Sequence, residues 1–98
     1  MSETIKVKAI FMSILGELIG MKEVEIELPE SSTFKDLMAV IKQEYGPKFP
    51  KELFKRSAGE FQYMHLMLNM KDIYEKKDGD HPLADGDVLY FIPPIGGG

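Results

Sequence analysis

The chain has 98 residues, 44% of them hydrophobic, which suffices for one domain with a single core and is too apolar for a disordered chain. Its net charge of -4, without runs of lysine or arginine, excludes nucleic acid as the main partner, and the absence of cysteine excludes disulfides and thiolate chemistry. No stretch has the length of a membrane span or the pattern of a signal peptide, so we expect a cytoplasmic protein that does not bind membranes.

The first part of the chain predicts a β-hairpin. Residues 4–13 are rich in β-branched and aromatic side chains and begin in alternation, which is typical of a strand. Residues 14–22 contain two glycines and predict a loop. Residues 23–28, EVEIEL, alternate strictly between glutamate and aliphatic side chains, so we expect a second strand that leads back along the first.

Residues 33–45 carry the strongest helix signal. Thr33 can cap the first turn together with Asp36, three residues further on. Gly46 suits the left-handed position at a helix end, and Pro47 cannot continue the helix. One face of this helix is apolar and consists of Phe34, Leu37, Met38, Ile41 and Tyr45.

The second half of the chain predicts shorter elements. Residues 50–56 indicate a short helical turn, and residues 57–61 indicate a loop. Residues 63–70 predict a strand region that is apolar in both phases, and after a turn residues 73–74 are expected as a short edge strand. The last strand, residues 88–92, VLYFI, is wholly apolar.

A wholly apolar strand is expected at the centre of a sheet. If this last strand pairs beside the first, the sheet is mixed and the helix packs across one of its faces. The sequence therefore predicts an α+β fold of the β-grasp, or ubiquitin-like, arrangement. We expect one domain over residues 1–98, with a flexible C-terminal glycine tail at residues 93–98.

Catalysis within the domain has no candidate residues. The stretch DGDHPLADGD, residues 78–87, lacks the ligand spacing of an EF-hand loop, so its Asp-Gly pairs are expected to form turns. His65 and His81 lie neither beside a serine nucleophile elbow nor in a ligand-spaced cluster. We therefore expect no metal, no bound cofactor and no catalytic side chain.

The strands that are apolar in both phases indicate a second apolar surface, because a sheet with one helix layer should be wet on its other face. One phase, assigned to the core, holds Phe11, Leu66, Leu68 and Phe91. The opposite phase holds Met12, Met67, Tyr90 and Ile92. Two interpretations of this second set remain open. The side chains are covered by loops or singly exposed, or they form a partner-binding patch in which methionines adapt to more than one surface.

The chain ends in PPIGGG, with no polar linker after the last strand. Pro93 and Pro94 hold the backbone extended, and Gly96, Gly97 and Gly98 give the thinnest backbone that a peptide can have. Such a segment can enter a narrow channel and present its carboxylate to a catalytic site on another protein. The reactive group would then be the terminal carboxylate itself.

Residues 80–98, DHPLADGDVLYFIPPIGGG, resemble the end of the MoaD/ThiS sulfur carriers, which are ubiquitin-like proteins with a C-terminal diglycine. The shared pattern is Asp-His-Pro-Leu, Asp-Gly-Asp, an apolar strand, Pro-Pro and Gly-Gly. Weaker similarities lie at Glu17, Leu18, Gly20, the helix and Asn69. The resemblance is closest to MoaD, the small subunit of molybdopterin synthase.

This resemblance implies a role in molybdenum cofactor biosynthesis. A MoeB-like activating enzyme, similar to the ubiquitin-activating enzymes, would adenylate the carboxylate of Gly98 with ATP, and sulfur would then replace AMP to leave a thiocarboxylate. The loaded tail would enter the large, MoaE-like subunit of molybdopterin synthase and donate sulfur to the pterin precursor. Met12 and Ile92 fall where family members tend to have partner-facing apolar residues.

Two features depart from the MoaD pattern. Gly96 stands where MoaD proteins usually have serine, threonine or alanine, and extra length lies near residues 48–61 and 75–80. The alternatives are a ThiS-like or CysO-like carrier for another sulfur acceptor, or a ubiquitin-like modifier that conjugates to lysines. A further alternative, from a different class, is a β-grasp interaction module with a chemically idle tail.

Overall fold

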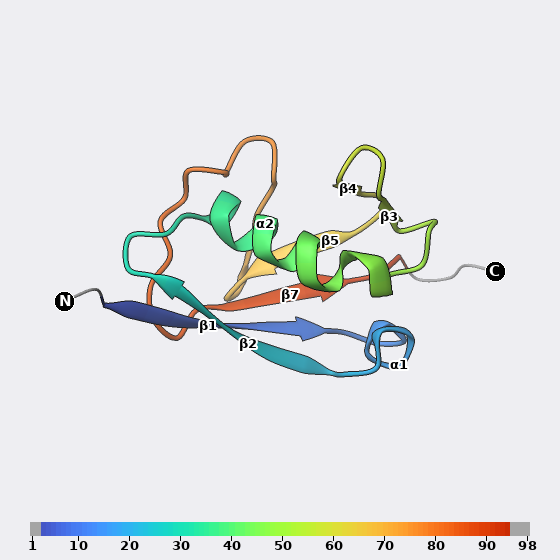
Figure 1. Cartoon of the computed structure of the whole chain (residues 1–98), viewed down its shortest axis with the longest axis horizontal. Helices are drawn as coiled ribbons and strands as arrows, with labels where there is room; N and C mark the ends of the chain where they lie inside the picture. The colour runs from blue at the N-terminus through green and yellow to red at the C-terminus, as the bar shows by residue number, and fades with distance from the viewer. Residues whose placement is uncertain (1–2, 95–98) are drawn as a thin grey trace.

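The computed structural model describes residues 3–94. A five-stranded sheet carries one long helix, α2, across one of its faces (Figure 1). The strands of this sheet are β1 (Thr4–Phe11), β2 (Glu23–Pro29), β5 (His65–Leu68), β6 (Lys71–Asp72) and β7 (Val88–Ile92), and α2 spans Phe34–Tyr45. No helix within the described part of the chain is long and apolar enough to cross a membrane.

Strand β7 lies at the centre of the sheet. The strand order is β2-β1-β7-β5-β6, with β7 parallel to β1 and antiparallel to β5. The prediction that the last strand pairs beside the first is confirmed, and so is the α+β fold of the β-grasp type. The parallel pairing of β1 and β7 directs the end of β7 toward the same edge of the molecule as the end of β1 (Figure 1).

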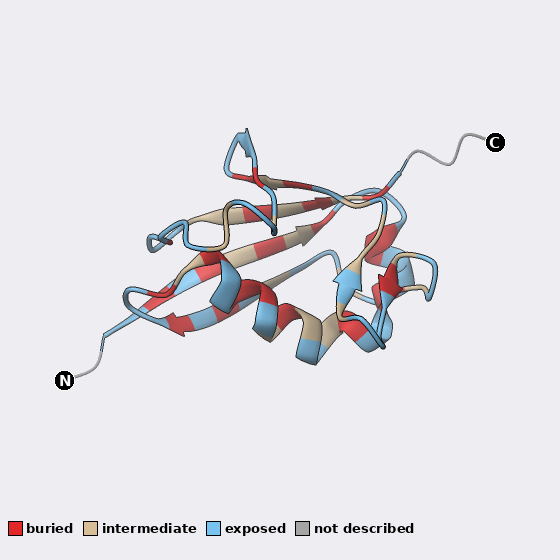
Figure 2. Cartoon of the chain, turned by 90° about the horizontal axis from the view of Figure 1, so that it is seen from above, coloured by how far each residue is buried: buried red, intermediate tan, exposed pale blue. Residues whose placement is uncertain are grey.

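The core lies between α2 and one face of the sheet. Buried and less buried residues alternate along the central strands, as Figure 2 shows by colour. On β7, Leu89 and Phe91 are fully buried, while Val88, Tyr90 and Ile92 on the opposite phase are only partly buried. The helix contributes Phe34, Leu37, Met38 and Ile41 to this core.

Helix α2 begins with the predicted capping box. The backbone N–H of Thr33 donates a hydrogen bond of 2.8 Å to Oδ2 of Asp36, and the Thr33 hydroxyl donates to the same oxygen at 3.1 Å. These hydrogen bonds, helped by the charge of Lys35, lower the pKa of Asp36 below its ordinary value of 3.8. The capping box thus holds a carboxylate at the positive end of the helix.

The end of α2 differs from the prediction. Gly46 is not left-handed; its φ of -50° continues into a 3₁₀ turn at Gly46–Lys48. A Cβ atom at this position would lie 2.6 Å from Cε2 of the buried Phe54 ring. Glycine is therefore required here for close packing, and backbone conformation is not the reason.

Several short elements differ from the prediction. Residues 15–19 form a helix, α1 (Leu15–Ile19), which ends at Gly20 with a φ of 95°. Strands β3 (Phe54–Lys55) and β4 (Glu60–Phe61) form a hairpin where a helical turn and a loop were expected, and the edge strand β6 precedes residues 73–74. The rings of Phe54 and Phe61, which pair across this hairpin, have centroids 4.8 Å apart. The Phe61 ring also packs against Phe49 and Phe91, so tertiary contacts stabilise the hairpin.

Candidate functional site: the outer sheet face and the chain exit

The start of β7 is fixed by side-chain hydrogen bonds. Asp87 accepts a hydrogen bond of 2.9 Å from the backbone N–H of Ala84, and Asn69 accepts one of 3.0 Å from the N–H of Val88. Asp85 accepts a bond of 2.7 Å from the N–H of Lys6 on β1. The Asp-Gly-Asp segment therefore acts structurally by setting where β7 begins. Within residues 3–94, no three histidine or acidic side chains gather as metal ligands would.

The other end of β7 delivers the chain out of the sheet. Ile92 is the last residue of the strand and pairs with His65 on β5. Pro93 is buried and Pro94 is exposed. Because proline has no backbone N–H, neither residue can donate to a neighbouring strand. The expected tail residues Gly96, Gly97 and Gly98 lie outside the described residues.

An apolar strip covers the sheet face opposite α2. Its centre is a row across three strands, in which Tyr90 lies between Ile10 on β1 and Met67 on β5. We call this surface the outer strip; it consists of Ile10, Met12, Met67, Val88, Tyr90 and Ile92. The structure thus brings the four side chains singled out from the sequence onto one face. Their role in partner binding stays a prediction.

The exposure of the outer strip is graded. Met12 is 39% exposed, whereas Met67, Tyr90 and Ile92 are intermediate because neighbouring strands cover part of each side chain. Ile10 and Val88 also belong to the outer strip but were not among the residues predicted to face a partner. Both share the phase of Tyr90 along their strands, so the same alternation could have identified them.

Charged residues border the outer strip on two sides. Beside Ile10, the edge strand β2 places Glu23, whose carboxylate lies 3.3 Å from Nζ of Lys8. Beside Met67, strand β6 places Asp72, whose Oδ1 lies 2.7 Å from Nε2 of His65. An apolar centre with a polar rim is the usual composition of a protein–protein interface.

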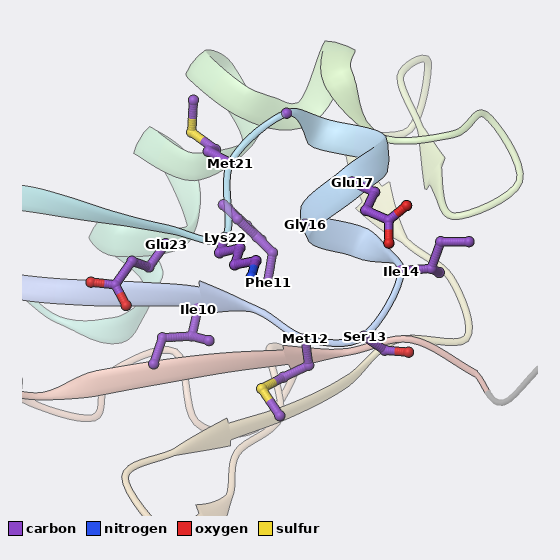
Figure 3. Close-up of a pocket in the computed structure, with 11 residues that line it drawn as sticks. Ile10, Phe11, Met12, Ser13, Ile14, Gly16, Glu17, Met21, Lys22 and Glu23 are labelled. Carbon is purple, nitrogen blue, oxygen red and sulfur yellow. The ribbon is translucent and has the colours of Figure 1, made fainter.

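The outer strip continues into an open depression between β1, α1 and the start of β2. The depression is lined in part by Ile10, Met12 and Ile14. Figure 3 shows Met12 and Ser13 beside the end of β7, and Ile14 at the start of α1. Ile14 and Leu18 are 55% and 49% exposed. Neither residue was predicted as part of a site, because residues 14–22 were expected to form a loop.

The arrangement defines a class of protein. It is a β-grasp domain whose central strand carries the C-terminal segment out beside an apolar face bordered by charges. Residues 9–98 match the model of the ThiS family, and the chain belongs to that family. Its fold is that of the ubiquitin-like sulfur carriers of the ThiS and MoaD type.

Solved structures resemble the chain over nearly its whole length. A putative molybdopterin converting factor subunit 1 from Pyrococcus furiosus is 31% identical, with a TM-score of 0.68 and coverage of 93% of this chain and 99% of that one. The small archaeal modifier SAMP1 from Haloferax volcanii has a TM-score of 0.76 at 21% identity, with coverage of 95% and 99%.

A third similar structure is a complex. It contains subunits 1 and 2 of the molybdopterin-converting factor from Helicobacter pylori, and the matching chain has a TM-score of 0.59 at 24% identity, with coverage of 96% of this chain and 100% of that one. No curated protein sequence matches the chain.

Proposed function

We propose that this protein is a sulfur carrier of molybdopterin biosynthesis, the small subunit of a molybdopterin synthase. The observation that carries the proposal is the path of β7. Asp87 and Asn69 fix the start of this central strand by hydrogen bonds. Two prolines follow its last residue, Ile92, beside the outer strip. Chemistry at the end of such a chain needs no catalytic side chain within the domain.

The proposed reaction begins at the carboxylate of Gly98. One carboxylate oxygen attacks the α-phosphorus of ATP on a MoeB-like activating enzyme, which releases pyrophosphate and leaves a mixed anhydride with AMP. A sulfur nucleophile then displaces AMP and leaves a thiocarboxylate. In the MoaE-like large subunit, this sulfur forms a bond to the pterin precursor, and water then hydrolyses the acyl–sulfur bond, which leaves the sulfur on the pterin and regenerates the carboxylate.

The domain's part in this cycle is binding and positioning. The outer strip offers the activating enzyme and the synthase subunit an apolar surface that contains two methionines, Met12 and Met67. Methionine is suited to more than one partner because its unbranched side chain adapts to different surfaces. A tail next to this surface would reach an active site while the folded part stays docked.

A second candidate is a ubiquitin-like protein modifier. The similarity in fold to SAMP1 favours this alternative, and the extra length near residues 48–61 departs from the MoaD pattern. Both functions share the adenylation step and differ in the acceptor, which is a pterin precursor in one case and a lysine amine in the other.

Intact mass spectrometry tests the proposal. We expect that the cognate activating enzyme, ATP and a sulfur source convert the full chain to a species in which one oxygen is replaced by sulfur. A variant without Gly98 should remain folded and give neither ATP–pyrophosphate exchange nor the mass change. Normal exchange by the truncated chain would overturn the proposal, and stable adducts on lysines of other proteins would favour the modifier.

A further inference from the structure

Tyr63 combines high exposure with an unfavourable backbone conformation. Its side chain is 76% exposed, which is unusual for a large aromatic residue. Its φ of 59° lies in the left-handed region, where bulky residues are rare and pay a conformational cost. A residue chosen for stability alone at this position would be glycine or asparagine. An exposed ring that is kept in a strained conformation therefore requires another explanation.

The strand register places Tyr63 beside the chain exit. His65, two residues after Tyr63, is the first residue of β5, and it pairs with Ile92, the last residue of β7. Tyr63 therefore lies two residues from the pair that ends the sheet at the chain exit. Pro94, the first exposed residue after β7, lies two residues from the same pair on the other strand.

Strand β1, the other neighbour of β7, is also followed by a residue in the left-handed region. The N–H of Met12 donates a hydrogen bond of 3.0 Å to the carbonyl of Phe91, and the next residue, Ser13, has a φ of 56°. The backbones on both sides of β7 therefore turn into the left-handed region at the level where Pro93 and Pro94 end the pairing.

The β3–β4 hairpin holds the segment before Tyr63 in place. The N–H of Gln62 donates a hydrogen bond of 2.8 Å to the carbonyl of Leu53. The Phe61 ring packs with its centroid 4.8 Å from that of Phe49 and 5.4 Å from that of Phe91. Since aromatic packing fixes the residues before Tyr63 and strand pairing fixes those after it, the exposed position of Tyr63 is imposed by the fold.

We propose that Tyr63 is a specificity-determining residue, whose ring packs against an apolar rim of the opening through which the activating enzyme takes up the tail. This inference rests on the proposed function and assigns a role to the segment of residues 48–61, which holds the ring in place. A tyrosine suits such a rim because its ring buries apolar area while its hydroxyl stays at the water boundary. Its loss of conformational freedom on binding is small because the fold has already positioned it.

Three variants separate the ring from the backbone. Tyr63→Asn removes the ring and keeps a residue that tolerates the left-handed conformation, so its thermal unfolding should match or exceed that of the wild type. Tyr63→Phe keeps the ring and removes only the hydroxyl. Met70→Asn is the matched control, because Met70 is 81% exposed and follows the far end of β5.

The assay is ATP–pyrophosphate exchange by the cognate activating enzyme, with the carrier as the varied substrate. We expect Tyr63→Asn to raise KM for the carrier about tenfold or more with little change in kcat, which corresponds to the loss of a contact made on docking. Tyr63→Phe and Met70→Asn should stay within about twofold of the wild type, since neither removes the ring.

The outcomes distinguish this inference from the proposed function. If the wild type supports exchange and Tyr63→Asn does so with an unchanged KM, Tyr63 takes no part in docking and only the inference fails. If the wild type supports no exchange, the proposed function fails and the inference fails with it. An equal rise in KM for Met70→Asn would attribute the effect to general surface polarity and would also overturn the inference.

Discussion

Where β7 begins, polar side chains hydrogen-bond to backbone groups, whereas where β7 leaves the sheet the contacts are between aromatic rings. We call the first region the polar end; its hydrogen-bonding side chains are Thr33, Asp36, Asn69, Asp85 and Asp87. We call the second region the exit end; its rings, with centroids 4.8 to 6.1 Å from their neighbours, are those of Phe11, Tyr45, Phe49, Phe54, Phe61 and Phe91.

The difference follows from what each end has to do. Hydrogen bonds are directional, so the polar end fixes the first residue of β7 and thereby how far the chain projects beyond Ile92. Aromatic packing stabilises the exit end, and neither Pro93 nor Pro94 has a backbone N–H that could pair with a neighbouring strand. The Asp-Gly-Asp part of the MoaD-like pattern thus lies at the end away from the proposed chemistry.

The largest effect is expected from the rings of the exit end. Phe91→Ala removes a fully buried side chain whose ring packs against those of Phe11, Phe49 and Phe61, so we expect a loss of about 3–5 kcal/mol in the free energy of unfolding. Denaturant unfolding measures this loss. Ile92→Ala is the control on the outer strip and should cost about 1 kcal/mol because the side chain is only partly buried. Equal losses for the two variants would contradict the assignment of the two faces.

The polar end should show a smaller effect. Asp87→Ala removes a carboxylate that accepts hydrogen bonds from the N–H of Ala84 and from the amide of Asn69, which should cost about 1.5–3 kcal/mol. Hydrogen exchange should also show faster exchange of the Val88 amide as the start of β7 loosens. Asp80→Ala is the control. The Asp80 side chain is 97% exposed, and its ion pair with Lys35 is long, with 3.8 Å between Oδ1 and Nζ. Similar destabilisation by both variants would argue against a structural role for the Asp-Gly-Asp segment.

The polar end was more predictable from the sequence than the exit end. The capping residues Thr33 and Asp36 are three positions apart, and an Asp-Gly pair forms a turn largely by itself, so local patterns suffice. The central position of β7 followed from its wholly apolar composition. These features depend on neighbours in sequence, whereas the hydrogen bonds from Lys6 to Asp85 and from Val88 to Asn69 join distant residues and were not predicted.

The exit end depends on contacts between distant residues. The two-residue strands β3 and β4 are held in place by the packing of Phe61 against Phe49 and Phe91, which no local pattern signals. Gly46 was assigned to the wrong conformation because the sequence does not show that the chain continues into a 3₁₀ turn against the Phe54 ring. Of the site, alternation gave Met12, Met67, Tyr90 and Ile92 of the outer strip but not Ile10 and Val88, and the left-handed Tyr63 has no signature in the sequence around it.

The smallest effect concerns the charge of the capping box. Because the pKa of Asp36 is lowered in the folded state, the carboxylate stabilises the fold at pH values above the unfolded value and loses that effect as the pH falls through the folded pKa. The difference in Tm between the wild type and Asp36→Asn should therefore be constant well above pH 3.8 and shrink below it. Asp80→Asn, an acid outside the helix, is the control and should show little difference at any pH. A difference that persists unchanged at low pH would mean that Asp36 acts through its shape and not through its charge.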